Sequence, residues 1–452
     1  MSDTLGEQSY AGVEKALLAR WPESKIDPTL DRIRAICNLL GEPQRAYPVI
    51  HLTGTNGKTS TARMIDALLR ALGLRTGRFT SPHLESMTER ITIDGAPLSR
   101  ERFVEVYTEV IPYAELVDAT SAYPLSFFET TTAMAFAAFA DAPVDAAVLE
   151  VGLGGTWDVT NIADAAVAVV TPVGVDHAHL LGGTPGEIAV EKAGIIKAGS
   201  VAVIAQQEVE VAEVLLRRVA EVGATVAREG LEFGVVQRSP GIGGQLVTLS
   251  GLGATYDDIF LPLYGAHQAH NAACAVAAVE ALAGGKALDG GLDAEVVRAA
   301  LAEVSSPGRL EIVRRSPTVI LDAAHNPHGA EAAAGTIQDE FSFSPLVGVL
   351  GVMSDKDAAG LLEAFEPVLS SVVCTQNSTA RAMPAAELAE IADGIFGSDR
   401  VEVVGRLDNA LERGIALAEA MPGDVGFGSG GVLVTGSVVT VGEARMLLGG
   451  GR

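Results

Sequence analysis

The sequence predicts an α/β protein with two domains, and three observations lead to that class. Short apolar segments alternate with stretches of helical periodicity along most of the 452 residues, which is typical of a parallel sheet with helices on both faces. Residues 231–264 instead hold short alternating segments broken by glycines, which favour a small antiparallel subregion. The pattern stops at the turn-forming cluster Ser305-Ser-Pro-Gly308 and then restarts. We therefore expect an N-terminal domain at 1–306 and a smaller, doubly wound domain at 307–452.

The expected elements follow from where the apolar segments fall. In the first domain we expect strands at 48–53, 144–151, 165–171 and 201–205, and helices at 59–72, 270–283 and 293–304. In the second domain we expect strands at 318–321, 346–352, 371–375, 401–404 and 432–435, with helices between them. Ligands of parallel sheets bind beyond the carboxyl ends of the strands. Residues that follow a strand are therefore the first candidates for a functional site.

Composition and charge exclude several classes of protein. Apolar residues make up 48 % of the chain, which is enough for sizeable cores. The formal charge of −25 leaves no surplus of cations for general binding to nucleic acid or to an anionic membrane surface. The chain has no apolar run of about 18 residues, its N-terminus lacks the features of a signal peptide, and its three cysteines lie far apart in sequence. We expect a cytoplasmic monomer with reduced thiols.

A glycine-rich loop between a strand and a helix is the sharpest motif. It reads Gly54-Thr-Asn-Gly-Lys58-Thr59, and such a loop points backbone N–H groups at a phosphate chain while the helix N-terminus adds its positive end. Lys58 would contact the β- and γ-phosphates, and Thr59 or Ser60 would ligate Mg²⁺. The first glycine stands two residues before the Gly-Lys pair instead of four, so the loop is a variant. The motif makes the first sheet P-loop NTPase-like, and the alternative is a helix start with a glycine turn.

Several polar residues follow other predicted strands. Glu150 ends a buried strand, where a carboxylate is costly unless it is paired or bound to a metal, although a solvated strand end is the alternative. It lies in residues 103–191, which contain no Lys or Arg, a gap due either to chance in a lysine-poor chain or to a need for an external cation. His177 and other paired histidines could suggest zinc, but the neighbouring carboxylates favour a hard cation. Asp322 could hold ribose hydroxyls in a Rossmann-like second domain, or could form a simple Asp-Asn-Pro turn.

Taken together, the motifs resemble the folylpolyglutamate synthase/dihydrofolate synthase family, part of the wider Mur-ligase-like group of ATP-dependent amide-bond-forming enzymes. The similarity runs from about Lys25 to Arg445. Besides the loop, it is carried by Thr80-Ser-Pro-His-Leu84, Glu89-Arg-Ile91, Phe127-Phe-Glu129, Glu150-Val-Gly-Leu-Gly-Gly155, Asp158-Val-Thr-Asn161, Asp176-His177, Glu191-Lys-Ala-Gly-Ile195, His270-Asn271, Pro307-Gly-Arg309, Asp322 to Pro327, Ser354-Asp-Lys-Asp357 and Thr435-Gly-Ser437. Two positions depart from the family: Thr59 stands where many relatives have Gly, and Trp157 where they often have Leu.

The resemblance implies an ATP- and pteroate-binding first domain and a glutamate ligase second domain. The implied ATP-binding residues are Thr55, Asn56, Gly57, Lys58, Thr59, Asn271, Arg309 and Asp322. Two Mg²⁺ ions are implied, with ligands Ser81, Glu150, Thr59, His177 and Lys192, the last as a carbamate. The implied folate- or pteroate-binding residues are Asp27, Pro28, Thr29, Leu30, Ser126, Phe127, Phe128, Glu129, Trp157, Asp158 and Val159. His325 and Ser437 are the candidates for the glutamate site.

The implied reaction is ATP-dependent amide formation between L-glutamate and the carboxylate of a folate or dihydropteroate, through an acyl phosphate, with release of ADP and phosphate. The implied catalytic residues are Lys58, Glu150, His177, Lys192 and His325. Both folylpolyglutamate and dihydrofolate synthase activities are expected. One alternative is a Mur-type cell-wall peptide ligase, but only about 50 residues precede the loop, too few for a UDP-binding domain. The other is a nucleotide-binding switch without ligase activity, which would have no need of the second-domain motifs.

Overall fold

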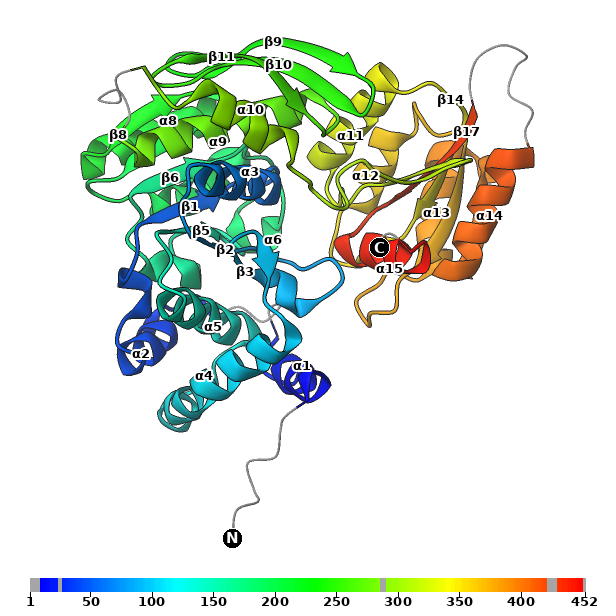
Figure 1. Ribbon diagram of the computed structural model, residues 1–452. Helices are drawn as coiled ribbons and strands as arrows, with labels where there is room; N and C mark the ends of the chain where they lie inside the picture. Colours follow the sequence, from blue (N-terminus) through cyan, green and yellow to red (C-terminus); the bar gives the residue numbers. More distant parts are fainter. Residues whose placement is uncertain (1–8, 23–26, 285–289, 421–428, 450–452) are drawn as a thin grey trace.

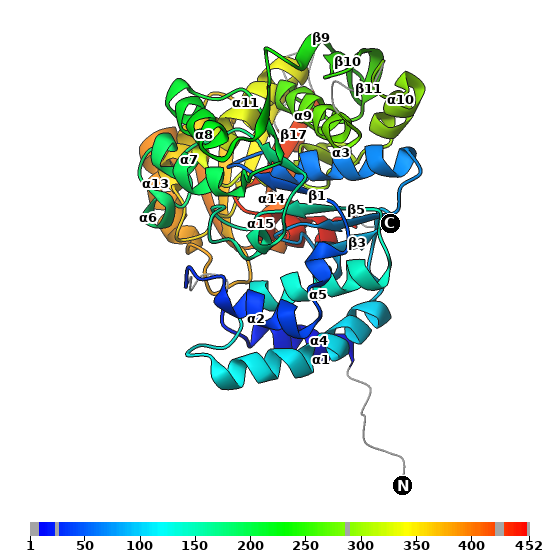
Figure 2. The same ribbon diagram turned by 90° about the vertical axis from the view of Figure 1, so that its left-hand side faces the viewer.

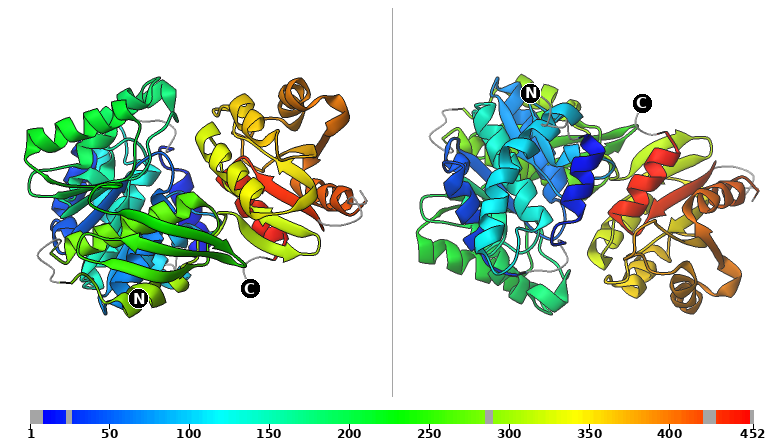
Figure 3. Two further views of the ribbon diagram at one scale, coloured as in Figure 1. Left: turned by 90° about the horizontal axis from the view of Figure 1, so that it is seen from above. Right: turned by 90° about the horizontal axis from the view of Figure 1, so that it is seen from below.

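The computed structural model describes residues 9–22, 27–284, 290–420 and 429–449. Figure 1 shows two α/β domains side by side, joined by the segment between α10 (Ala294–Ala302) and β12 (Glu311–Arg315). Figure 3 shows from above and below that each domain has its own sheet and its own helices. The predicted fold class is confirmed. The turn-forming cluster at 305–308 lies in the joining segment, and the functional division at 306/307 stays a prediction.

The N-terminal sheet has eight strands in the order β4-β3-β2-β5-β1-β6-β7-β8. Its parallel strands are β1 (Val49–Thr53), β2 (Thr76–Phe79), β5 (Ala146–Glu150), β6 (Val167–Val170), β7 (Val201–Ile204) and β8 (Thr225–Arg228). The short strands β3 (Ile91–Ile93) and β4 (Ala96–Pro97) run antiparallel at one edge. These two strands are not predicted from the sequence, because two or three residues are too few to show a strand period.

Helices cover both faces of this sheet (Figure 2). Along β1, Ile50 and Leu52 pack in the cluster that contains α3 (Lys58–Ala71), α9 (Ala266–Leu282) and α10, whereas Val49 packs in the opposite cluster. This alternation is the two-residue period of a strand that is buried on both faces. The opposite cluster contains α1 (Tyr10–Leu18), α2 (Asp31–Leu39), α4 (Arg100–Thr120) and α5 (Phe127–Asp141). The helices α6 (Ala178–Leu181), α7 (Pro185–Lys192) and α8 (Val209–Val222) pack around β6 and β7.

An antiparallel sheet of three strands lies over α9, as the glycine-broken segments predicted. It consists of β9 (Gly234–Gly241), β10 (Gly244–Ser250) and β11 (Thr255–Leu261), in the order β11-β10-β9. A buried ion pair fixes α3 to the main sheet: Asp66 accepts from Arg78 Nη1 at 3.0 Å and from Thr76 Oγ1 at 2.6 Å. These bonds hold the helix that follows the glycine-rich loop against β2.

The C-terminal sheet has six strands in the order β12-β13-β17-β14-β15-β16. Its parallel strands are β13 (Thr318–Leu321), β14 (Phe343–Leu350), β15 (Ser371–Gln376), β16 (Val401–Arg406) and β17 (Ser429–Thr435), and β12 pairs antiparallel with β13. One face carries α11 (Pro327–Glu340), α12 (Ala358–Phe365) and α13 (Ala385–Phe396), and the other α14 (Leu407–Ala420) and α15 (Val438–Leu447). The five predicted strands are all present, and β12 is an addition.

Two further features concern the cysteines and the lengths of the apolar helices. Cys37, Cys274 and Cys374 are all free and buried. A search of the described helices for one that is both long and apolar enough to cross a bilayer finds none.

Candidate active site

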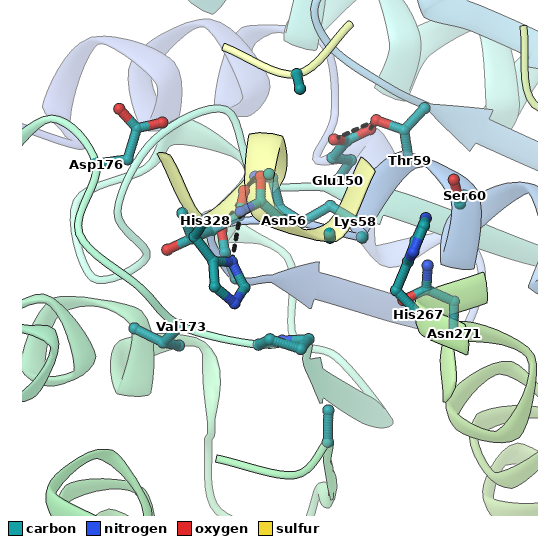
Figure 4. Close-up of a pocket in the computed structure, with 18 of the residues that line it drawn as sticks. Asn56, Lys58, Thr59, Ser60, Glu150, Val173, Asp176, His267, Asn271 and His328 are labelled. Carbon is teal, nitrogen blue, oxygen red and sulfur yellow. Dashed lines mark hydrogen bonds between the residues drawn. The ribbon is translucent and has the colours of Figure 1, made fainter. Parts of the chain in front are cut away.

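A cavity of 520 Å³ lies where the strands β1, β5 and β6 end, and residues of both domains line it. Figure 4 shows the glycine-rich loop on one side of this cavity, with Glu150 and Thr59 close together beyond it. From the second domain the lining includes Asp322, His325 and His328. The cavity is therefore closed only when the two domains face each other.

The glycine-rich loop depends on its glycines. Gly54 and Gly57 have φ values of 146° and 88°, in the region that disfavours side chains. A Cβ at Gly54 would overlap Thr171, and one at Gly57 would overlap the Asn271 side chain. The Thr55 hydroxyl donates to Gly174 O at 2.9 Å and fixes the loop from inside. Asn271, predicted to contact ATP, thus lies directly against the loop.

Lys58, the first residue of α3, folds back over the loop. Its Nζ donates to Gly54 O at 3.0 Å and to Thr55 O at 3.2 Å. Burial lowers the pKa of Lys58, while the charges of Glu150 and Asp176 act in the opposite direction. A cation held in this way is positioned to meet a phosphate chain above the loop.

Glu150 brings three predicted metal ligands together. Its carboxylate, 1 % exposed, accepts from Thr59 Oγ1 at 2.8 Å and from the Ser81 backbone N–H at 3.4 Å. Burial raises the pKa of Glu150, and Lys58 and the hydroxyl of Thr59 lower it. A buried carboxylate next to two hydroxyl-bearing residues is an oxygen donor set that suits Mg²⁺.

The ligands predicted for the second metal ion, Lys192 and His177, form a less compact group. Lys192, 4 % exposed at the end of α7, donates to Gly54 O at 2.9 Å, and burial lowers its pKa to about 7. His177 also lines the cavity, but its Nε2 lies 3.1 Å from Lys356 Nζ. Burial lowers the pKa of His177 to about 4, so the ring is neutral near pH 7 and can act as a ligand. Within the described part of the chain, no three His, Cys, Asp or Glu side chains form a metal-binding group, so the predicted sites depend on other ligands, Ser81 and Thr59 and the carbamate predicted at Lys192.

Asp176 joins the two domains across the cavity. Its carboxylate accepts from Lys356 Nζ at 2.6 Å and from Asn326 Nδ2 at 3.1 Å, and it lies 3.5 Å from His325 Nε2. Asn326 in turn bonds Asn56 of the loop at 3.2 Å. Asp176 and Lys356 belong to motifs that resemble the family, but the sequence alone predicts no role for either residue. The signal that could have found them is their position in the loops that follow strands β6 and β14.

Arg309 and Asp322 lie where the chain enters the second domain. The buried carboxylate of Asp322 accepts from the backbone N–H groups of Leu310 and Ala324, both at 2.9 Å. Burial raises the pKa of Asp322, and Arg309 lowers it. Both residues line the cavity, so the structure brings all eight predicted ATP-binding residues to one place.

The predicted pteroate-binding segments lie together, outside the lining of this cavity. Arg32 links two of them by donating to Asp27 at 2.6 Å and to Glu129 at 3.0 Å. Glu129 also forms a capping box with Ser126 at the start of α5. Asp158 accepts from the backbone of Gly152 and Leu153, each at 3.0 Å. The remaining members of these segments are Pro28, Thr29, Leu30, Phe127, Phe128, Trp157 and Val159.

These segments meet the cavity at Gly152, which is part of its lining. A Cβ at Gly152 would overlap the Phe128 ring, so ring and loop are in close contact. Trp157 is held by its backbone N–H, which donates to Glu191 at 3.1 Å. The acidic side chains of these segments are thus engaged in local hydrogen bonds, and their predicted role in substrate binding stays a prediction.

Ser437 lies at the start of α15, and its hydroxyl accepts from Thr440 N at 3.0 Å and lies 3.4 Å from Asn377 Nδ2. It is 2 % exposed and is not part of the cavity lining, although the next residue, Val438, is. His325, in contrast, lines the cavity and lies 3.0 Å through Nδ1 from Ala323 O. The structure thus places one of the two predicted glutamate-site residues in the cavity.

Comparisons with known proteins match both domains. A family model described as "Mur ligase middle domain" matches residues 52–279, and one described as "Mur ligase, glutamate ligase domain" matches residues 308–438. The "Dihydrofolate synthase/folylpolyglutamate synthase" of Mycobacterium tuberculosis is 52 % identical, over 98 % of this chain and 94 % of that protein. The structure of M. tuberculosis folylpolyglutamate synthase complexed with ADP superimposes with a TM-score of 0.93, at 51 % identity and over 98 % of both chains. Escherichia coli FolC in complex with DHPP and ADP superimposes with a TM-score of 0.83, at 31 % identity and over 98 % of both chains.

Proposed function

The chain belongs to the dihydrofolate synthase/folylpolyglutamate synthase family of Mur-type ATP-dependent ligases, and on that premise we propose how its own residues carry out the ligation. The substrates are ATP, L-glutamate and a carboxylate acceptor, which is dihydropteroate or a reduced folate. Both acceptors are served, so the chain is bifunctional. The observation that supports this most directly is the cavity in which the phosphate-type loop, Glu150 and the second domain face each other.

A carboxylate is a poor electrophile and has to be activated before an amine can attack it. An oxygen of the acceptor carboxylate bonds the γ-phosphorus of ATP, ADP leaves, and an acyl phosphate results. The amine of L-glutamate then bonds the acyl carbon, phosphate leaves, and the amine gives up a proton. The catalytic contribution of the protein is to position these groups and to neutralise charge that develops on the phosphates.

The loop residues 55–59 hold the phosphate chain, with the Lys58 ammonium directed at its terminal groups. Asn271 and Asp322 hold the nucleoside end, and Arg309 approaches from the start of the second domain. Each of these residues lines the same cavity, which supports a single nucleotide site. The positive charges of Lys58 and Arg309 favour the departure of ADP, because they lie where its negative charge increases.

The residues around Glu150 fit a divalent cation. Ser81, Glu150 and Thr59 would hold one Mg²⁺, and His177 with a carbamylated Lys192 would hold a second. Such ions would neutralise phosphate charge when bound. The support on this chain is the buried Glu150 carboxylate, with its raised pKa and its two oxygen-bearing neighbours.

The protonation state of Lys192 supports its proposed role as a carbamylated ligand of the second metal ion. The lysine ammonium first loses one proton; the neutral amine nitrogen then bonds the carbon of CO₂ and loses a second proton, so that a cation is replaced by a carbamate anion. A pKa of about 7 makes the neutral amine abundant near neutral pH. The product would place a carboxylate-like group at the loop, where the Nζ atoms of Lys192 and Lys58 both donate to Gly54 O.

His325 is the proposed acceptor of the amine proton. Its Nε2 points at Asp176 across the cavity, 3.5 Å away, so the imidazolium formed on proton transfer has a carboxylate partner. L-glutamate binds on this side, between His325 and the start of α15 near Ser437. The acceptor enters past Gly152, with its pterin ring near Phe128 and Trp157.

Release of ADP tests the assignment. With L-glutamate present, the purified chain should release ADP with 7,8-dihydropteroate and also with tetrahydrofolate, and release should fall to background when either glutamate or the acceptor is omitted. ADP release that continues unchanged without glutamate would contradict ligase function. If ADP is released with only one of the two acceptors, the proposal is reduced to the synthase activity that uses this acceptor. Light scattering on the same sample tests the expected monomer.

A further inference from the structure

Arg63 is a half-buried cation for which the reaction as described has no use. It lies on α3, one turn after Thr59. Among the described residues it makes no hydrogen bond and no ion pair, whereas Arg70 and Arg78 near the same helix both pair with Asp66. Burial lowers the pKa of Arg63, the more distant charges of Glu89, Glu150 and Asp66 act in the opposite direction, and the positive charge of Arg309 adds to the lowering. A buried charge without a partner is costly, so its retention calls for an explanation.

Arg63 and Arg309 line a second hollow, of 40 Å³, beside the main cavity. Arg309, like Arg63, has no carboxylate within ion-pair distance among the described residues, and its nearest bond is a long one of 3.5 Å to Gly308 O. The hollow has room for about three water molecules. That volume admits a carboxylate group but excludes a nucleotide or a complete amino acid.

The acidic residue in the lining does not satisfy these cations. The carboxylate of Glu89 accepts from the backbone N–H groups of Leu84, Glu85 and Ser86, at 2.9, 3.0 and 2.7 Å. Its oxygens are therefore engaged within their own loop. The two guanidinium groups keep their donors available for an anion that enters the hollow.

The hollow lies where the amino-acid end of the reaction is expected. It shares Thr59 and Arg309 with the main cavity, so an anion there would be next to the phosphate loop. The wall from the second domain includes Ala323 and Val438. Val438 directly follows Ser437, and the carbonyl oxygen of Ala323 lies 3.0 Å from His325 Nδ1, from which it can accept a hydrogen bond.

We propose that Arg63 and Arg309 form a subsite for a substrate carboxylate that does not react. This inference rests on the proposed ligase function, because it assigns the carboxylate to one of that reaction's substrates. Two sources share this chemistry: the α-carboxylate of the incoming L-glutamate, and the α-carboxylate of the glutamyl end of a folate acceptor. Dihydropteroate has no such group, since its only carboxylate is the one that reacts. A comparison of dihydropteroate with a folate as acceptor therefore distinguishes the two possible sources of the carboxylate.

The experiment compares Arg63→Met, Arg63→Lys and Arg70→Met with the unchanged enzyme. Each KM is measured for L-glutamate, tetrahydrofolate, dihydropteroate and ATP. Loss of a charge-assisted hydrogen bond predicts a rise of roughly tenfold to a hundredfold in one KM for Arg63→Met, with partial recovery in Arg63→Lys. Arg70→Met removes a cation from the same helix and should leave every KM unchanged.

The pattern of KM values identifies the source. A higher KM for L-glutamate with both acceptors assigns the subsite to the incoming amino acid. A higher KM for tetrahydrofolate, with the KM for dihydropteroate unchanged, assigns it to the acceptor. The proposal would be overturned if neither the KM for L-glutamate nor the KM for tetrahydrofolate changed. It would also be overturned if only the KM for ATP changed or if only kcat fell. Arg63 would then be a charge that offsets Glu150. Thermal melting checks that the variants fold, and the activity of the unchanged enzyme tests the ligase function separately.

Discussion

Lys192 should react with CO₂ at neutral pH. Its Nζ is buried, and its one hydrogen bond goes to a carbonyl, Gly54 O, at 2.9 Å. No carboxylate among the described residues pairs with it, so burial lowers its pKa from 10.5 to about 7. At pH 7 about half of the amine is then neutral, compared with roughly one molecule in 3000 for an unperturbed lysine. The reactive form is enriched about a thousandfold.

The assay is ¹³C NMR of the protein in ¹³C-labelled bicarbonate. We expect one carbamate resonance that disappears in Lys192→Gln and persists in the matched control Lys197→Gln. Lys197 is suited to this control because its Nζ donates to two carbonyls, Asn161 O and Ala163 O, and to Asp164. Burial lowers the pKa of Lys197 as well, so the comparison isolates the site and not lysine burial in general.

The pH dependence has a definite sign. Below pH 7 the Lys192 amine takes up a proton and can no longer attack CO₂, so the resonance should weaken as the pH falls and strengthen as it rises. The reasoning is refuted if the wild-type protein gives no carbamate resonance at pH 8. It is equally refuted if Lys192→Gln retains the resonance.

Three further substitutions test the site and its support. Lys58→Met should lower kcat roughly a hundredfold to a thousandfold, because it removes the cation above the loop, while thermal melting shows an intact fold; undiminished turnover would contradict the phosphate-binding role. Asp66→Asn should cost about 3 kcal/mol of unfolding free energy in urea titrations, because Arg78 is left as a buried charge without its carboxylate. Asp176→Ala should increase the radius of gyration in small-angle scattering, because it removes the 2.6 Å ion pair to Lys356 that joins the domains, and an unchanged radius would argue against this link.

The glycine-rich loop could be predicted from the sequence because its determinants are local. A strand, two glycines and a helix start within ten residues fix the backbone, and the positive φ values of Gly54 and Gly57 explain why glycines stand there. Glu150 could be predicted for a similar reason. A carboxylate at the end of an apolar strand has to face the same edge of the sheet as the loop when the strands are parallel neighbours, as β1 and β5 are.

The contacts of Asp176 could not be predicted in this way. Lys356 is 180 residues further along the chain and belongs to the other domain, so their ion pair depends on how the two domains face each other. No local pattern carries that information. The resemblance to a family pointed to both motifs, but it did not give their partner.

The pteroate segments illustrate the opposite limitation. Sequence similarity suggested Asp158 and Glu129 as substrate contacts, yet backbone N–H groups and Arg32 already engage their oxygens. Whether a side chain is free or engaged depends on groups that are distant in sequence, such as Arg32 for Glu129. The segments lie together, while the hydrogen bonds of their polar atoms depend on the folded arrangement and their role in pteroate binding stays a prediction.

The absence of Lys and Arg from residues 103–191 has a structural counterpart in the cavity. This stretch supplies Glu150 and Asp176, and the cations that meet them come from outside it: Lys58 from the loop and Lys356 from the second domain. Asp158 belongs to the same stretch but is satisfied by backbone N–H groups and needs no cation. In a chain with a net charge of −25, Glu150 and Asp176 thus come from one segment and the cations that meet them from others, while Asp322 adds a carboxylate from the second domain. Lys58 meets Glu150 within the first domain, whereas Asp176 gains its cation only when the two domains come together, because Lys356 belongs to the second.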